Sequence, residues 1–458
     1  MILRRPQRLK LNRLSDKNKI FLILFAGILI RTLYVIFMPV VNFAQYDMGT
    51  VDFENNVLTG HLGYIFWLVK YHAVPSFDPR LIYQFNHPPV HHALCALWVS
   101  FIGLFTDNSK TLIESVQFIT LIYSVITLLA FERILEETRV SENGKILALL
   151  IFTFQPTIVM TAGSVNNDGA GLMFQMLAIW FALRFYRTKA YRDIIGIALF
   201  IGIGMLSKLS AGLIAVPIGV LFVYILVKES IDEKKFALKR FVQYIVFGAI
   251  CFPLGLFWVL RCYIKFGMPF TYIAFLPETS WQYVGMYSAF ERLFLPNPVT
   301  LIENISNGSI GMGWNIWVQL FRTSALGECD MALFPLFVKL ICFLLMAVNF
   351  SVALWAFIAF IRTYAGFNNN NTAVNAGTRI IWILSWLIMM YSYFSFANKY
   401  PHECSMNFRY VQFAMVPPMV AVAVAEGEGG GLKKLKNIVI AAYSILSAAV
   451  LICWCMVA

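Results

Sequence analysis

The sequence predicts an all-α polytopic membrane protein of about eleven transmembrane helices, with the N-terminus inside and the C-terminus outside. The chain of 458 residues is 59% hydrophobic and only 13% charged, whereas a soluble domain carries roughly 25% charged residues. Its apolar runs are about 18–25 residues long, which suits membrane-spanning helices better than barrel strands. Because lipid offers no partner to free backbone N–H and C=O groups, these runs should be helical.

The expected spans follow one another along most of the chain. The first apolar run has a basic flank and extends too far for the short core of a signal peptide, so we expect a retained span with that flank in the cytoplasm. The spans are predicted at residues 20–39, 112–131, 145–163, 169–186, 192–207, 209–227, 241–260, 334–361, 379–396, 409–425 and 437–456.

The apolar stretch 90–105 is ambiguous. Short basic loops, such as those at 184–192 and 228–240, should all face the cytoplasm. They do so only if 90–105 does not cross and instead lies against the outer face of the bilayer. If it does cross, another weak segment, such as 192–207, must fail to cross.

This topology divides the chain into four parts. A basic cytoplasmic N-terminus (1–19) precedes a membrane module (20–260) that includes an outer loop at 40–111. A second outer loop (261–333) and the C-terminal transmembrane helices (334–458) follow. Both long loops are rich in aromatic residues and proline, which predicts structured caps rather than disorder.

The composition also limits which binding partners and cofactors we expect. The formal charge of +12 resides in short loops between apolar runs, so it indicates membrane topology and not nucleic-acid binding. The eight cysteines show no metal-ligand spacing, and we expect no metal site and no certain cofactor, although a divalent metal stays open. Membrane lipids are the expected surroundings.

The first outer loop opens with a carboxylate at the membrane boundary. Asp47 comes soon after the first span ends, at the depth where a lipid-anchored substrate would present its polar head. It could serve there as a general base on an acceptor hydroxyl, or it could be a solvated loop acid. Asp52, five residues further on, is a second candidate contact to the substrate.

The same loop carries a histidine-rich motif. His87 precedes two prolines, which are tolerated in the first turn of a helix, and three of the six histidines fall in this stretch. A phosphate contact by His87 near the helix start is one interpretation; a histidine at the interface without a ligand is the other. His91 and His92 are adjacent and should point in different directions, which disfavours zinc.

A second acidic motif, Val165-Asn166-Asn167-Asp168, joins two predicted spans. Asn and Asp are favoured at helix N-termini, where the helix dipole suits a carboxylate. Asp168 could equally be a catalytic acid and Asn167 a polar contact to the substrate, and these interpretations are compatible.

Three cations map to the outer ends of spans: Lys208, Arg261 and Arg409. Ionisable groups at membrane depth are costly, which makes each a candidate for function, and arginine can bind phosphate through two parallel hydrogen bonds. The alternative is a side chain that snorkels to the interface. Arg31 lies inside the first span, and whether it pairs or snorkels is open.

The ordered motifs resemble those of the GT-C class of membrane glycosyltransferases, in the branch of protein O-mannosyltransferases and lipid A aminoarabinose transferases. The resemblance rests on Asp47 after the first span, His87-Pro88-Pro89 in the same loop, and Asp168 between later spans. The stretch from Arg261 to Phe266-Gly267-Met268-Pro269 is similar to the start of the family's large outer loop. These motifs cover roughly the first 270 residues, and the predicted topology extends the resemblance to the whole chain.

The resemblance implies an inverting transfer of sugar from a polyprenyl-phosphate donor to an acceptor outside the cytoplasm, in a multi-pass protein of the cell membrane. Asp47 would be the base, and His87 stands where some relatives have a phosphate-binding lysine. Many relatives have Asp-Glu at the first motif, whereas Met48 follows Asp47 here, which puts a metal role in doubt. The sugar and the acceptor stay undetermined.

The alternative from a different class is a transporter or lipid-linked sugar flippase. Transporters of that kind place polar sites near the bilayer midplane, on broken helices related by internal symmetry. The polar candidates here gather at one face of the membrane, which favours the transferase.

Overall fold

The structure is a computed structural model that describes residues 15–40, 47–274, 276–294, 313–327, 335–366, 374–426 and 433–457. Most of the predicted basic N-terminus and parts of the second loop therefore lie outside the described residues. Most of the described chain is helical, and it also contains two short antiparallel strands, β1 (Val51–Asp52) and β2 (Val57–Leu58). The predicted all-α membrane class is confirmed.

Among the described residues, seven helices are long and apolar enough to cross a membrane. They are α1 (Asp16–Phe37), α5 (Gln117–Thr138), α8 (Asp168–Thr188), α10 (Ala215–Asp232), α11 (Leu238–Phe266), α15 (Leu336–Phe360) and α16 (Ala376–Lys399). A bent pair, α6 (Glu142–Thr153) and α7 (Pro156–Met160), makes an eighth if it counts as one span. Three further helices occupy the other expected spans: α9 (Tyr191–Ser207), α17 (Val416–Glu426) and α18 (Lys433–Val457).

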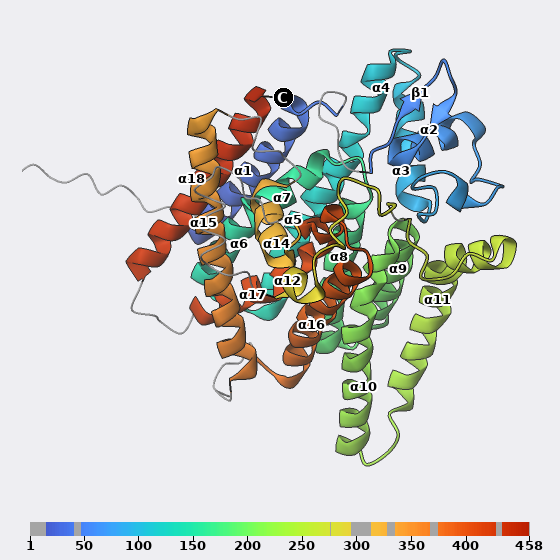
Figure 1. The fold of residues 1–458 in the computed structure, drawn as a ribbon. Coiled ribbons are helices and arrows are strands. Elements are labelled where there is room, and N and C mark those ends of the chain that lie inside the picture. The colour runs from blue at the N-terminus through green and yellow to red at the C-terminus, as the bar shows by residue number, and fades with distance from the viewer. Residues whose placement is uncertain are drawn as a thin grey trace, which may run out of the picture.

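The first long loop folds into a small subdomain with its own hydrophobic core. It contains β1, β2, α2 (Gly60–Tyr71), the 3₁₀ turn η1 (Pro79–Leu81), α3 (Val90–Ile102) and α4 (Ser109–Ser115). Figure 1 shows this subdomain at one corner of the bundle, at the upper right, away from the connection between α10 and α11 at the bottom. It is the structured cap that its aromatic content predicts.

Helix α3 lies beside the bundle and is too short to cross a bilayer. Its 13 residues at about 1.5 Å per residue fall well below the roughly 30 Å hydrocarbon core. One face exposes apolar side chains, among them Leu97 and Phe101, while His91, His92 and Cys95 are buried on the opposite face. This amphipathic pattern suits a helix that lies in the interface, as the topology argument for 90–105 expects.

The C-terminal end of α11 fixes the first loop to the bundle. The indole Nε1 of Trp258 donates to the carbonyl of Asn86 at 2.9 Å, and Arg80 donates to the carbonyl of Phe266 at 2.8 Å. Trp258 is almost fully buried. These bonds fix the position of the histidine-rich motif relative to the membrane helices.

The break between α6 and α7 leaves backbone groups unpaired inside the bundle, and side chains from other helices satisfy them. Pro156 begins α7 after a bend of 63°. Arg31 of α1, fully buried, donates to the carbonyl of Thr153 at 3.1 Å and to Ser124 Oγ at 3.0 Å. Arg31 therefore caps the broken helix, which settles the alternative left open by the sequence in favour of a buried, hydrogen-bonded residue.

The second loop packs back on the bundle through short contacts. Helix α14 (Ile316–Leu326) lies against α15 and α7, and the carbonyls of Thr323 and Ser324 accept from Thr157. The helix α12 (Ala289–Leu293) is attached to α16 through Arg292, which donates to the carbonyl of Ala397 at 2.5 Å. Three 3₁₀ turns, η6 (Glu403–Met406), η7 (Phe408–Tyr410) and η8 (Gln412–Met415), then lead into α17.

Candidate active site

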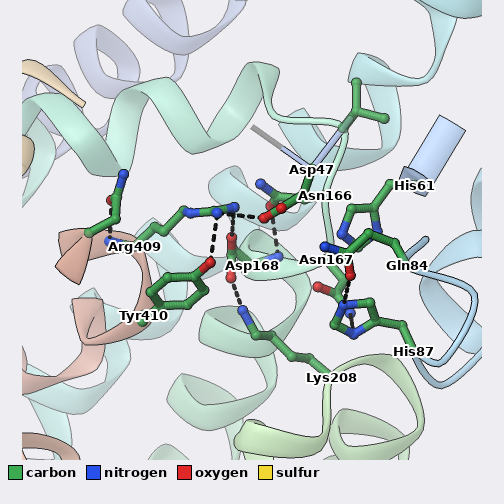
Figure 2. A network of polar contacts seen from close by, with 12 residues as sticks. Asp47, His61, Gln84, His87, Asn166, Asn167, Asp168, Lys208, Arg409 and Tyr410 are labelled. Atoms are coloured by element: carbon green, nitrogen blue, oxygen red, sulfur yellow. Dashed lines mark hydrogen bonds and ion pairs between the residues drawn. The ribbon is translucent and has the colours of Figure 1, made fainter. Parts of the chain in front are cut away.

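Four charged side chains from distant parts of the sequence meet in the interior of the protein. Arg409 donates through Nη2 to Asp47 Oδ2 at 2.5 Å and through Nη1 to Asp168 Oδ2 at 3.2 Å. Lys208 pairs with the other oxygen of Asp168. Figure 2 shows the guanidinium between the two carboxylates, with the ammonium approaching Asp168 from the opposite side. We call Asp47, Asp168, Lys208 and Arg409 the charged cluster.

Asp47 is held by a backbone crossing in the first loop. Its φ of 66° lies in the left-handed region, where a non-glycine residue is strained. The amide of His61 donates to the Asp47 carbonyl at 3.1 Å. Gly49 and Gly60 also have positive φ, and a Cβ on either would collide with the backbone of the other segment. The two glycines therefore permit the close crossing that positions Asp47.

Asp168 begins α8, and its neighbours fix its position. Asn166 Oδ1 accepts from the Asp168 amide at 3.0 Å. Asn167 donates from Nδ2 to the carbonyl of Ser207 at 2.8 Å, which brings the start of α8 to the end of α9, where Lys208 follows. The favourable end of the helix dipole and the two cations all stabilise the ionised Asp168.

Arg409 lies in η7, between the helices α16 and α17. Asn407 Oδ1 accepts from the Arg409 amide at 2.9 Å. Tyr410 stabilises both cations: its hydroxyl accepts from Arg409 Nη2 at 2.7 Å, and its ring lies 5.2 Å from Lys208 Nζ. With only 7% of Arg409 exposed, the guanidinium is buried and hydrogen-bonded in several directions, which excludes a snorkelling role.

The electrostatics of the cluster keep Asp47 ionised. Burial alone would raise the pKa of the Asp47 carboxyl, but the Arg409 guanidinium and the Tyr83 hydroxyl outweigh burial and lower that pKa below 3.8. The two carboxylates balance the two cations in formal charge. A buried site of this kind is stable only while each charge retains its partner.

Beside the charged cluster lies a neutral histidine cluster, formed by His61, His87, His91 and His92. His61 and His92 stack with ring centroids 5.1 Å apart and share a hydrogen bond of 2.9 Å. His87 stacks on His61 at 4.9 Å. Burial lowers the pKa of all four, to about 3 for His87 and about 4 for His91.

His87 connects the two clusters. Asn167 donates to His87 Nδ1 at 3.3 Å, so the proton of the neutral ring must be on Nε2, which donates to Gln84 Oε1 at 2.7 Å. A contact between His87 and a phosphate would therefore be a neutral hydrogen bond, and it would have to replace the bond to Gln84.

The residues of the site do not fit a metal ion. Among the described residues, no group of three or more His, Cys, Asp or Glu side chains is arranged to hold one. The two aspartates already face Arg409 and Lys208, and the histidines are directed at one another and at backbone carbonyls such as that of Val165.

Two predicted site residues lie apart from the charged cluster. Asp52 caps a turn, where its carboxylate accepts from the amides of Glu54 and Asn55 at 3.0 and 2.9 Å. Arg261 donates to the carbonyl of Pro75 at 2.6 Å and lies over the Trp258 ring. Both residues contact the first loop and its anchor, and their role in binding substrate stays a prediction.

Sequence reasoning missed Tyr83 and Tyr410. The Tyr83 hydroxyl donates to Asp47 Oδ1 at 2.5 Å, and Tyr410 contacts both cations. Tyr410 follows directly after Arg409, which is a signal that could have been used. Nothing in the sequence distinguishes Tyr83 among the 20 tyrosines.

The arrangement provides the parts for an acid–base reaction on an anionic substrate. Asp47, the more accessible carboxylate, is available as a base, and two cations lie next to it where an anionic leaving group would need neutralisation. Asp168, only 2% exposed at its side chain, orients these cations.

Part of the chain is similar to a known protein family. Residues 86–259 match the family model described as dolichyl-phosphate-mannose-protein mannosyltransferase. The matched stretch includes His87, Asp168 and Lys208, while Asp47 and Arg409 lie outside it. A comparison with curated protein sequences found no match.

Among solved structures, the fold is similar to that of the oligosaccharyltransferase of Archaeoglobus fulgidus. Its crystal structure with zinc and sulfate matches with a TM-score of 0.51 at 15% identity, over 94% of this chain and 53% of that chain. The apo crystal structure gives a TM-score of 0.49 at 13% identity, over 94% and 56%. The chain thus spans about half the length of that enzyme. The chain is thus similar to the mannosyltransferase family over residues 86–259, and its fold is similar to that of the oligosaccharyltransferase.

Proposed function

We propose that the protein is an inverting glycosyltransferase that transfers a sugar from a polyprenyl-phosphate donor to an acceptor hydroxyl on the extracytoplasmic side. The observation that carries the proposal is the charged cluster: two carboxylates and two cations from four distant segments converge beside a family-matched stretch. A lipid-linked sugar phosphate presents an electrophilic carbon next to an anion, which is what such a cluster would recognise.

In this mechanism Asp47 accepts the proton of the acceptor hydroxyl as its oxygen attacks the anomeric carbon. The bond between that carbon and the phosphate oxygen breaks, and the electron pair leaves with the polyprenyl phosphate. Arg409 and Lys208 neutralise the phosphate as it leaves, which is electrostatic stabilisation by groups already in place. A single displacement of this kind inverts the anomeric configuration.

The active-site side is part of the proposal and rests on the distribution of charge. The basic segment 228–240 connects α10 and α11 at the end of the bundle opposite to β1, α2 and α3 in Figure 1. Basic loops favour the cytoplasm, so the first loop and Asp47 would face outward, in a multi-pass protein of the cell membrane.

The direct test uses purified protein in nanodiscs with a panel of radiolabelled polyprenyl-phosphate sugars. We expect wild type to release or transfer one of these sugars and Asp47→Asn to lose this activity. Glu54→Gln, which removes an exposed acid from the same loop, is the matched control and should retain activity. Binding without turnover, together with movement of the lipid-linked sugar between leaflets, would support the flippase alternative instead.

A further inference from the structure

The Asp47 carboxylate has two hydrogen-bond donors of different kinds. Oδ2 accepts from the Arg409 guanidinium, and Oδ1 accepts from the Tyr83 hydroxyl, both at 2.5 Å. A general base must come within about 2.6–3.2 Å of the hydroxyl whose proton it takes. An acceptor hydroxyl that gives its proton to Asp47 would therefore have to take the place of one of these two donors.

Exposure distinguishes the two donors. Arg409 is buried and is also fixed by Asp168 and Tyr410. Tyr83 is 38% exposed. An acceptor that enters from outside would therefore reach Asp47 from the side of Tyr83, while the guanidinium closes the interior side.

The backbone around Tyr83 is fixed to the crossing that positions Asp47. The amide of Gly60 donates to the Tyr83 carbonyl at 3.0 Å, and the next amide, that of His61, donates to the Asp47 carbonyl. Gln84 has a φ of 65°, in the left-handed region. The Tyr83 side chain can therefore move away from Asp47 while its backbone stays bonded to this crossing.

Tyr83 and its neighbour Gln84 make separate side-chain hydrogen bonds. His87 donates to Gln84 Oε1 at 2.7 Å, whereas the Tyr83 hydroxyl donates to Asp47 Oδ1. A phenol hydroxyl bound in this way has the same donor role toward the carboxylate as an alcohol of a substrate.

We propose that the Tyr83 hydroxyl occupies the position of the acceptor hydroxyl in the empty enzyme, and that the acceptor displaces it from Asp47 Oδ1. This inference rests on the proposed function of Asp47 as the base. The ligand class is an aliphatic alcohol, whether it belongs to a sugar or to a hydroxyl side chain. Tyr83 is then a positioning residue that holds Asp47 until the acceptor replaces it.

The step is balanced without any further reactant. The acceptor proton passes to Asp47 Oδ1, the acceptor oxygen bonds to the anomeric carbon, and the phosphate leaves with the electron pair. Asp47 then releases the proton to water on the exposed side, and the Tyr83 hydroxyl returns to the carboxylate.

Steady-state kinetics of Tyr83→Phe test the inference, with acceptor concentration and pH varied. Because Phe cannot compete for Asp47, we expect the KM for the acceptor to fall about three- to tenfold, somewhat less than the full loss of a hydrogen bond to a charged group. The hydroxyl also lowers the pKa of Asp47, so its loss should move the acid limb of kcat/KM to higher pH.

Tyr71→Phe is the matched control, since Tyr71 is an exposed tyrosine of the same loop and contacts Trp67. It should change neither the KM nor the pH limb. An unchanged KM and pH limb in Tyr83→Phe would overturn the inference, as would a fall in kcat alone. Tyr83→Leu gives the same comparison if the Phe variant does not accumulate, and an inactive wild type would count against the proposed function itself.

Discussion

The charged cluster and the histidine cluster lie side by side, and both are buried. They differ in how they offset the free-energy cost of burying ionisable side chains. Asp47, Asp168, Lys208 and Arg409 are paired with one another in ion pairs. The histidines bond to one another and to neutral groups such as Gln84 and the Val165 carbonyl, and burial lowers their pKa values so that they stay neutral. A buried ionisable side chain is therefore either paired with an opposite charge or kept neutral, and here the paired cluster supplies the charges that a charged substrate could bind.

Removing the shared partner of the two carboxylates should have the largest effect on stability. Arg409→Met leaves Asp47 without its cation and Asp168 with Lys208 alone, so we expect a loss of about 3–5 kcal/mol. Thermal unfolding in detergent measures it. Adding Asp47→Asn removes the stranded charge and should recover part of the loss. Equal stability of Arg409→Met and wild type would contradict the paired description of the cluster.

Acidification should destabilise the protein through the histidine cluster. The folded pKa of His87 is lowered to about 3, against about 6.5 when unfolded. The stability that a neutral histidine contributes is therefore complete above pH 6.5 and is lost as the pH falls toward 3. Between pH 6.5 and 5.5 we expect roughly 1 kcal/mol of loss for each such histidine.

The histidine prediction is checked by unfolding temperatures at pH 7.5 and 5.5. His92→Asn, which cannot be protonated in this range, should reduce the difference between the two temperatures. His72→Gln, at an exposed position outside the cluster, should leave the difference unchanged. If both variants behave like wild type, the cluster does not control the acid response.

Arg261 is a cation outside the charged cluster, so it can be compared with Lys208 inside the cluster. Arg261→Met removes the bond to the Pro75 carbonyl and the contact with Trp258, which should cost roughly 1 kcal/mol. We expect donor affinity to be unchanged. Lys208→Met should instead weaken donor binding, and the reverse ranking in a donor-binding isotherm would return Arg261 to the site.

The sequence predicted the fold well because hydropathy and loop charge follow directly from the lipid environment. It also identified the individual members of the charged cluster, since ionisable groups at membrane depth are rare. Their pairing could not be predicted, because Asp47 and Arg409 are 362 residues apart. Arg31 is also an ionisable group at membrane depth, but it caps a broken helix and is not part of the charged cluster. The bend in that helix could not be predicted from the sequence.

Tyr83 was missed for a different physical reason. Its contact with Asp47 depends on the crossing of Gly49 and Gly60, which is a tertiary feature created by two positive-φ glycines. An exposed tyrosine in a chain rich in aromatic residues carries no local signal of its role. Asp52 and Arg261 were predicted by residue type, and their hydrogen bonds are to the first loop, away from the charged cluster.

The most direct test of the account separates donor binding from chemistry. Donor affinity and single-turnover sugar transfer should be measured in nanodiscs for wild type, Asp47→Asn and Arg409→Lys. The account predicts that Asp47→Asn binds the donor as wild type does and transfers at least about 100-fold more slowly, as expected for loss of a general base, whereas Arg409→Lys binds the donor more weakly. Transfer at the wild-type rate by Asp47→Asn would contradict the central claim that Asp47 is the base.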